Sequence, residues 1–271
     1  MVTPREGLPR YLILQHEAFL QTLDSHLLTA PITIPIRRVL DIGTGCGIWA
    51  ADLAVEYPDA EIIGVDVFPQ PKITAPPNCQ FIHMDAEKEW DLGDEKFDVM
   101  HTRIVPFNSE HLPNVLRQCY DHLTPGGYME MQEMWPPCRT DEPAGAPEHS
   151  SKIIQWGKLR LEAALKTGVN QAITGTLPDA LAEAGFEDIH TYDTKMPIGT
   201  WMEDEKMRQV GQTYLELTQL GAVASSQKGQ LSTVGLGDQQ VEDLMDQVNK
   251  ELGVAKVYMP VRIVWARKPR Q

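Results

Sequence analysis

The chain has 271 residues, enough for one α/β domain with additions or for two small domains. Hydrophobic residues make up 42% of it, which provides for a sizeable core and argues against global disorder. The 24 Lys and Arg residues against 38 Asp and Glu residues give a net charge of −14, which argues against nucleic acid or an anionic membrane as a partner.

Apolar periodicity predicts the first elements in chain order. An amphipathic helix is expected over residues 9–28, where Leu12, His16 and Phe19 share one face. From about 37 to 133, strands and helices alternate. The expected strands are 39–42, 61–66, 80–85, 96–101 and 128–132, and the expected helices are 48–57 and 112–123. This alternation favours an α/β fold with a parallel doubly wound sheet.

In the second half of the chain, the apolar pattern predicts further helices and two more strands. Helices are expected over about 150–166 and 177–184, and in two later segments that carry Met207–Leu217 and Val241–Leu252. A Ser/Gly/Gln-rich loop is expected at 225–237, between those two. Strands are expected at 187–192 and 256–268, and Pro260 in the last one indicates an edge position or a bulge.

The cysteine and histidine spacings carry no metal signature. The four cysteines form no C-x-x-C pair, and the histidines show neither H-x-H nor H-E-x-x-H, so no metal site is expected. No secretory signal and no membrane-spanning run is visible. We therefore expect a soluble intracellular protein, in the cytoplasm, with the nucleus as the alternative.

The glycine-rich stretch Val39–Trp49 is the most informative segment. It is typical of a strand with an acidic residue, Asp41, followed by three alternating glycines and a helix. Glycine tolerates positive φ and lets the backbone approach a ligand, and such a loop at the end of a strand binds nucleotide-like ligands. The third glycine is Gly47, where the dinucleotide fingerprint G-x-G-x-x-G requires one at 48, which disfavours an NAD-linked dehydrogenase. A tight structural turn is the alternative.

Two further aspartates follow the next strands. Asp66 ends the second strand, where a carboxylate can accept hydrogen bonds from both hydroxyls of an adenosine ribose; a helix N-cap is the alternative. Asp85 ends the third strand, with an ordinary surface aspartate as the alternative.

Several motifs occur along the chain in the same order as in one enzyme family. The pattern D-x-G-x-G-x-G at 41–47 resembles motif I of the class I S-adenosylmethionine (SAM) methyltransferases, and Asp85-Ala86, Phe97–Arg103 and Leu123–Tyr128 fit its later motifs. Tyr11–His16, His101–Arg103 and Glu130–Glu133 resemble a fungal subgroup that includes regulator-type and tailoring methyltransferases of secondary metabolism. The match covers roughly 10–135. It departs at Cys46, where relatives mostly carry Thr or another small residue, and at 104–108, which does not align.

The resemblance implies a Rossmann-like fold of the class I methyltransferase type with added helices that form a lid. It implies SAM as cofactor and transfer of its methyl group, by in-line displacement, to a small-molecule acceptor of secondary metabolism. The alternative is a SAM-binding regulatory protein that acts through protein partners with little turnover. The resemblance also allows the protein to form a homo-oligomer. We expect a single domain, with a lid helix at 1–35, a SAM-binding core at 36–135, an insertion or lid at 136–175, and completion of the sheet and substrate-side helices at 176–271.

The same resemblance assigns site residues. The expected cofactor-binding residues are Gln15, Asp41, Gly43, Thr44, Gly45, Asp66, Val67, Asp85, Ala86, Thr102 and Arg103. Arg103 would face the methionine carboxylate, with a surface salt bridge as the alternative.

Two residues are candidates for a catalytic role. Glu133 would orient the acceptor or take its proton, with an end-of-strand cap as the alternative. His16 would point into the site from the lid helix, with a packed core histidine as the alternative; His101 falls inside a strand and is expected to be packed.

The acceptor pocket should come from segments outside the sheet motifs. These are the N-terminal helix, the region 134–166 and the helices near 201–252. Their aromatic and sulfur-containing residues, Trp135, Trp156, Met202, Met207, Tyr214 and Met245, would suit a small hydrophobic acceptor, although such residues are most often core.

Overall fold

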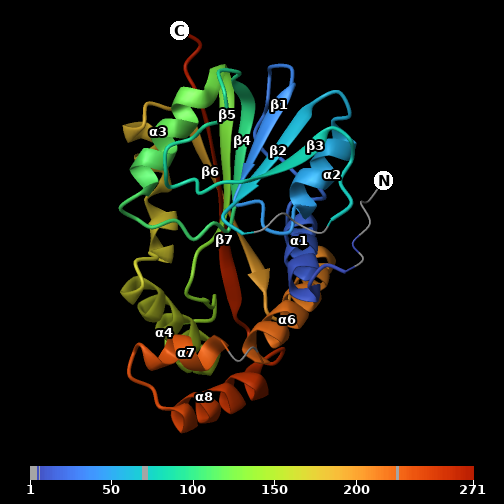
Figure 1. The fold of residues 1–271 in the computed structure, drawn as a ribbon. Coiled ribbons are helices and arrows are strands. Elements are labelled where there is room, and N and C mark those ends of the chain that lie inside the picture. The colour runs from blue at the N-terminus through green and yellow to red at the C-terminus, as the bar shows by residue number, and fades with distance from the viewer. Residues whose placement is uncertain (1–4, 6, 69–72, 224–225) are drawn as a thin grey trace.

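The computed structural model describes residues 5, 7–68, 73–223 and 226–271, with side chains left out at 171–172, 222–223 and 226–228. In the described residues the centre is a seven-stranded sheet with the order β3-β2-β1-β4-β5-β7-β6 (Figure 1). The strands are β1 (Arg38–Ile42), β2 (Glu61–Asp66), β3 (Cys79–His83), β4 (Phe97–Arg103), β5 (Leu123–Met134), β6 (Glu187–Pro197) and β7 (Tyr258–Arg267).

Strands β1 to β5 are parallel, which confirms the doubly wound arrangement. The chain order reverses between β1 and β4, and ligands of open α/β sheets bind at the carboxyl ends of strands beside such a switch point. Strand β7 is antiparallel to both β5 and β6, so the sheet is mixed. The alternation of strands and helices did not predict this antiparallel insertion.

Helices cover both faces of the sheet and one of its ends. They are α1 (Arg10–Thr22), α2 (Ile48–Glu56), α3 (Leu112–His122), α4 (Lys152–Lys166), α5 (Leu177–Glu183), α6 (Glu205–Val223), α7 (Ser226–Ser232) and α8 (Asp238–Glu251), with short 3-10 turns at Pro147–Ser150 and Gln171–Gly175. Helix α2 packs on β2 and β3, whereas α3 contacts β5, and α5 contacts β6 and β7. In Figure 1, α4, α7 and α8 gather at the end of the sheet opposite the C-terminus, beyond the carboxyl ends of the parallel strands.

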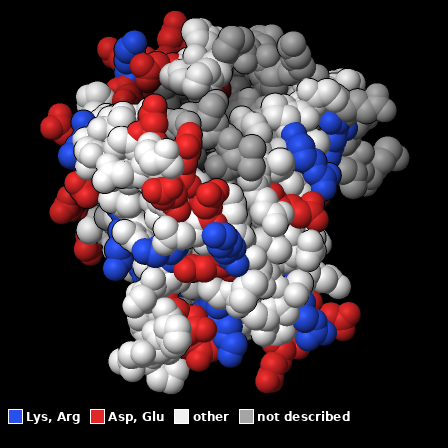
Figure 2. Space-filling model, turned by 90° about the horizontal axis from the view of Figure 1, so that it is seen from below, with Lys and Arg blue, Asp and Glu red and all other residues white. Residues whose placement is uncertain are grey.

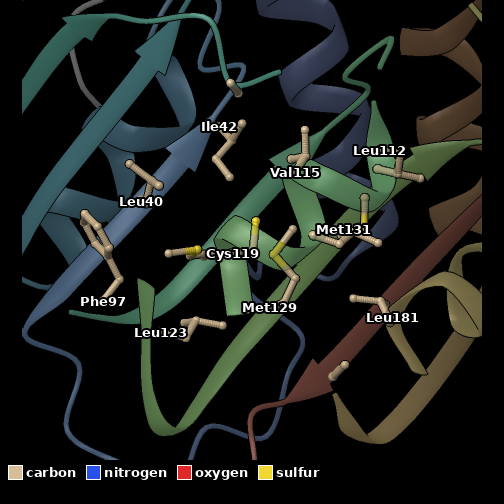
Figure 3. Close-up of a cluster of buried hydrophobic side chains, with 14 of the residues drawn as sticks. Leu40, Ile42, Phe97, Leu112, Val115, Cys119, Leu123, Met129, Met131 and Leu181 are labelled. Carbon is tan, nitrogen blue, oxygen red and sulfur yellow. The ribbon is translucent and has the colours of Figure 1, made fainter. Parts of the chain in front are cut away.

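The core between the sheet and α3 is built from side chains that alternate along the strands. Leu40, Phe97 and Met129 come from three neighbouring strands and belong to one buried cluster with Cys119 of α3 and Leu181 of α5 (Figure 3). All five are fully buried. Because burial of one such side chain contributes about 1.5–3 kcal/mol, this layer anchors α3 and α5 to strands β1, β4 and β5.

Local chemistry sets several helix ends. Helix α1 ends at Thr22 rather than continuing to 28, because Asp24 and Ser25 adopt φ of 53° and 66°, which a helix cannot accommodate. Ser151 caps α4 by accepting the amide of Ile153 at 3.1 Å. Gly185, with φ of 96°, ends α5 as its position predicted.

Two sequence predictions in the second half were wrong. Part of the expected loop at 225–237 is helix α7, and Ser225 lies outside the described residues. Strand β7 is an interior strand without a bulge at Pro260, not an edge strand. The proline is tolerated because the β5–β7 ladder ends there. The amide of Trp135 donates to the Pro260 carbonyl at 2.8 Å, and the amide that proline lacks would have made only the last bond of the ladder.

Charged side chains of both signs are interspersed on the face at the α8 end of the molecule (Figure 2). No helix among the described residues has the length and apolar character to cross a bilayer.

Candidate active site

The glycine loop between β1 and α2 has the backbone conformation that its sequence predicts. Gly43, Gly45 and Gly47 have φ of 71°, 56° and 74°, a region that other residues enter at a cost. A Cβ atom added to Gly45 would meet nothing within 4 Å, so the space above that residue is open. A Cβ atom on Gly43 would lie 2.4 Å from Cγ2 of Val105, so the segment after β4 rests directly on the loop.

A hydrogen bond between Asp41 and Thr44 stabilises this loop. Asp41 is 3% exposed; its Oδ2 accepts the Thr44 hydroxyl at 2.7 Å and its Oδ1 pairs with Nδ1 of His101 at 2.8 Å. The His101 ring stacks on Trp49, with ring centroids 3.6 Å apart. The prediction that His101 is packed is confirmed. The contacts of Asp41 fit a positioning role better than the direct cofactor contact expected for it.

Asp66 and Asp85 lie at the carboxyl ends of neighbouring strands. Asp66 is half-buried, and its two oxygens accept the amides of Gly45 at 2.7 Å and Phe68 at 3.0 Å. Its carboxylate is therefore tied to the glycine loop while each oxygen keeps a lone pair for a further donor. Burial acts to raise the pKa of Asp85, but the Glu87 amide and the Lys88 ammonium group outweigh it and lower the pKa. Next to these aspartates, Val67 is 51% exposed and Ala86 is buried.

Arg103 at the end of β4 is part of a buried polar chain that reaches α1. Its guanidinium donates to Nδ1 of His16 at 2.9 Å, and Nε2 of His16 lies 3.1 Å from the Asp52 carboxylate. Arg5 also bonds Asp52, at 3.2 Å. The guanidinium also lies over the Phe19 ring at 5.3 Å. Arg103 is half-buried and pairs with an imidazole, so the alternative of a surface salt bridge is wrong.

His16 has no ring nitrogen left for catalysis. Because Arg103 can only donate, Nδ1 of His16 must be the acceptor and Nε2 must carry the proton. Burial lowers the pKa of His16 to about 4, so the ring is neutral at pH 7. The side chain is fully buried and is not among the residues that line the cavity described below. This placement corrects the expected catalytic role and agrees with the alternative of a packed histidine.

The positive charge of Arg103 lies close to the glycine loop. Burial lowers the pKa of Arg103 to about 10, and the charges of Asp41 and Cys46 act in the opposite direction. The guanidinium remains charged at neutral pH and stands beside the loop, where it can attract an anionic group.

Glu133 at the end of β5 is a buried carboxyl group beside a cavity. Burial raises its pKa to about 8, although the amides of Val105 and Ile104 and the Thr102 hydroxyl act to lower it. Its Oε1 atom has no hydrogen-bond partner among the described residues. A carboxyl group with these properties can exchange a proton near neutral pH.

The cavity has a volume of about 270 Å³ and is lined mainly by apolar and aromatic side chains. Its walls come from α1, the segment after β4, β5, α4, α6 and the 3-10 turn at Gln171–Gly175, and they include Gln15, Val105, Phe107, Met131, Glu133, Trp156, Arg160, Tyr214 and Leu217. Trp156 and Tyr214 line it as the sequence suggested. Trp135 and Met207 line a separate hollow, and Met245 belongs to the core. The prediction that these three residues line the acceptor pocket was therefore wrong for this cavity.

Three residues of the cavity wall, Ile104, Val105 and Arg160, are not predicted from the sequence. Ile104 and Val105 lie in the segment that does not align with the family, and Ile104 has φ of 54°, a conformation that costs a β-branched residue about 1–3 kcal/mol. The position of Arg160 does carry a sequence signal. Arg160 follows Trp156 by four residues on a helix and so falls on the same apolar face.

Comparison with known proteins identifies the family. A family model described as a methyltransferase domain matches residues 14–191. The chain is 28% identical to methyltransferase cpsF of Aspergillus campestris over 95% of both chains. It is 30% identical to the probable methyltransferase tdiE of Emericella nidulans over 95% of this chain and 81% of tdiE. It is 31% identical to the secondary metabolism regulator LAE1 of Cochliobolus heterostrophus over 86% of this chain and 77% of LAE1.

Solved structures share the fold. YcgJ of Bacillus subtilis has a TM-score of 0.55 at 14% identity, over 95% of this chain and all of YcgJ. Phosphoethanolamine N-methyltransferase 2 of Haemonchus contortus, solved with S-adenosylmethionine, has a TM-score of 0.50 at 15% identity. That match spans 97% of this chain but only 53% of the Haemonchus contortus enzyme.

These matches define an enzyme of the class I methyltransferase fold. The chain belongs to the methyltransferase domain family and is a SAM-dependent methyltransferase. The residues present fit the cofactor. The glycine loop leaves open space above Gly45, Asp66 offers carboxylate lone pairs at the end of β2, and Arg103 supplies a cation beside the loop.

Proposed function

We propose that the chain transfers the methyl group of SAM to a small, largely apolar secondary metabolite. The observation that carries the proposal is the position of the cavity. Val105 lines it and also rests on Gly43 of the glycine loop, so acceptor space and cofactor loop adjoin. Apolar walls with a few polar groups are typical of small-molecule sites. The names of cpsF, tdiE and LAE1 support fungal secondary metabolism as the source of the acceptor.

Cofactor binding is assigned to the carboxyl ends of β1 to β4. Asp66 would accept hydrogen bonds from the ribose hydroxyls, Asp85 and the amide of Ala86 would contact the adenine ring, and Arg103 together with Thr102 would hold the methionine end. The backbone of the glycine loop would contact the same end, and Val67 and Gln15 would border the cofactor. When bound, the cofactor supplies a methyl group activated by the adjacent sulfonium.

The protein's own contribution is orientation and the exclusion of water. The cavity would hold the acceptor and fix its orientation toward the cofactor, which lowers the barrier by proximity. Glu133 takes the proton of a hydroxyl or ammonium acceptor, since its carboxyl group lines the cavity and keeps one oxygen unpaired among the described residues.

The test is methyl transfer itself. Purified protein is incubated with SAM labelled in the methyl group and with size-fractionated fungal extract. We expect label in an organic-soluble product of low molecular mass. Label that appears only in protein, or nowhere while SAM is bound, would contradict a small-molecule acceptor.

A regulatory function is the second candidate, and one observation favours it. The chain is 34% identical to the secondary metabolism regulator laeA of Aspergillus flavus over 65% of this chain, although it covers only 48% of laeA. A protein of this kind would bind SAM and partner proteins with little turnover. Affinity purification that recovers a stoichiometric protein partner, together with no labelled small product, would favour regulation.

A further inference from the structure

One positive charge lies in the wall of the acceptor cavity. Arg160 is on α4, whose buried face carries Ile153, Trp156, Ala163 and Ala164. Arg160 falls between Trp156 and Ala163 on this face, where helical periodicity favours an apolar residue. Its side chain is half-buried and lines the cavity.

The guanidinium of Arg160 has no anionic partner among the residues that the structure describes. Its Nε atom is buried and without a hydrogen-bond partner, and its recorded contact is with the Trp156 ring, 5.1 Å from the ring centroid. A buried charge without a counter-ion is costly, so such a group usually has a partner. The neighbouring wall cannot supply one. Burial raises the pKa of Cys138 to about 12, against the charge of Arg160, and likewise raises that of Tyr214, so both are neutral at pH 7.

Arg160 and Glu133 occupy different parts of the cavity. The groups that shift the pKa of Glu133 are its burial, Val105, Thr102 and Ile104, and Arg160 is not among them. The amides of Ile104 and Val105 act on Glu133, and Val105 rests on Gly43, so Glu133 lies on the side of the cavity toward the glycine loop. Arg160 lies beside Cys138, Trp156 and Tyr214. A molecule that fills the cavity therefore meets a proton acceptor at one end and a cation at the other.

We propose that the methyl acceptor is an organic acid: an apolar, aromatic-sized molecule whose carboxylate pairs with Arg160 while its nucleophilic group faces Glu133. The inference rests on the proposed function, because it names the class of acceptor for that same cavity. Arg160 is then a specificity residue. A guanidinium can bind both carboxylate oxygens, which a lysine cannot do in the same way.

The test compares acids with their amides. Hydroxyarenecarboxylic acids of one, two and three rings, each paired with its primary amide, are titrated into the protein saturated with S-adenosylhomocysteine at pH 7.5. The proteins are the wild type, Arg160→Met, Arg160→Lys and the control Lys158→Met, which removes an exposed charge from the same helix. We expect at least one acid to bind the wild type and the control about 10- to 100-fold more tightly than its amide. Arg160→Met should abolish that preference, and Arg160→Lys should keep part of it.

Three results would overturn the inference. They are equal affinity of acid and amide for the wild type, a preference that persists in Arg160→Met, and no binding of any acid. If Arg160→Met fails to fold, the wild-type ratio and Arg160→Lys still decide. Affinity for S-adenosylhomocysteine is measured in the same samples, so a failure of the proposed methyltransferase function is seen separately from a failure of acid recognition.

Discussion

The buried carboxyl group of Glu133 has the proton affinity that a base near neutral pH needs. Because burial raises its pKa to about 8, the ionised form is the minor one at pH 7 and becomes the major one above pH 8. We expect kcat/KM for an acceptor that carries a proton to rise with pH and level off above about 8. Glu133→Gln should lower kcat about 100-fold or more and remove this pH dependence.

The matched control for this prediction is Glu95→Gln, which neutralises an exposed carboxylate far from the cavity. Its pH profile should match that of the wild type. An unchanged profile in Glu133→Gln would assign Glu133 to a structural cap at the end of β5.

Gly43 and Val105 form a contact that substitution can test. An alanine at Gly43 places a methyl group against Val105 and also requires φ of 71°, a conformation that costs an L-residue about 1–2 kcal/mol. Gly45→Ala suffers only the conformational cost, because its added methyl group meets open space. We expect Gly43→Ala to lower the free energy of unfolding more than Gly45→Ala does, as measured by urea denaturation.

The double variant Gly43→Ala/Val105→Ala isolates the steric part of this cost. It should recover part of the stability relative to the sum of the single variants, since the two residues are in contact. Strict additivity would show that the segment after β4 does not rest on the glycine loop.

At the scale of elements, helix α1 is joined to the sheet by polar contacts between distant residues. His16 connects Arg103 of β4 to Asp52 of α2, and it must be neutral to accept from Arg103. Its folded-state pKa of about 4 is below the ordinary value of 6.5, so the unfolded chain binds a proton first as the pH falls. Stability associated with this group is therefore fully present above about pH 6.5 and is lost as the pH falls toward 4.

A substitution at His16 tests this pH dependence of the free energy of unfolding. His16→Asn should lower the free energy of unfolding at pH 7.5, while the difference from the wild type should shrink between pH 6.5 and 4.5. His149→Asn, which replaces an imidazole at an exposed position, is the control. A difference that stays constant over this pH range would contradict the proposed protonation state.

The elements that sequence predicts well here are those with local signals. The strands of the parallel sheet, the glycine loop and the end of α5 at Gly185 follow from periodicity and from residues that favour particular turns. What sequence did not reveal depends on contacts made after folding. Asp41 meets His101 60 positions away, and His16 meets Arg103 87 positions away. The antiparallel position of β7 likewise depends on pairing with β5 and β6, which no local pattern in residues 256–268 encodes.

For the whole molecule, the sheet topology brings the glycine loop and the cavity together. The switch between β1 and β4 places the glycine loop beside the segment that follows β4, and that segment forms a wall of the cavity. Helices α1, α4 and α6, strand β5 and the 3-10 turn at Gln171–Gly175 supply further walls. A net charge of −14 gives the molecule a field that repels anions, so an acidic acceptor would depend on the local charge of Arg160. The division of the chain into a lid, a cofactor core, an insertion and a substrate-side region stays a prediction, as does its location in the cell.

We infer that the loop at 43–47 and Asp66 hold SAM at the carboxyl ends of β1 and β2. Isothermal titration with S-adenosylhomocysteine, on the wild type and on Asp66→Asn, measures this binding. We predict one site per wild-type chain and an affinity at least about tenfold weaker in Asp66→Asn, because the neutral amide accepts hydrogen bonds from the ribose less strongly. Absence of binding to the folded wild-type protein, or equal affinity for a correctly folded Asp66→Asn, would contradict the account.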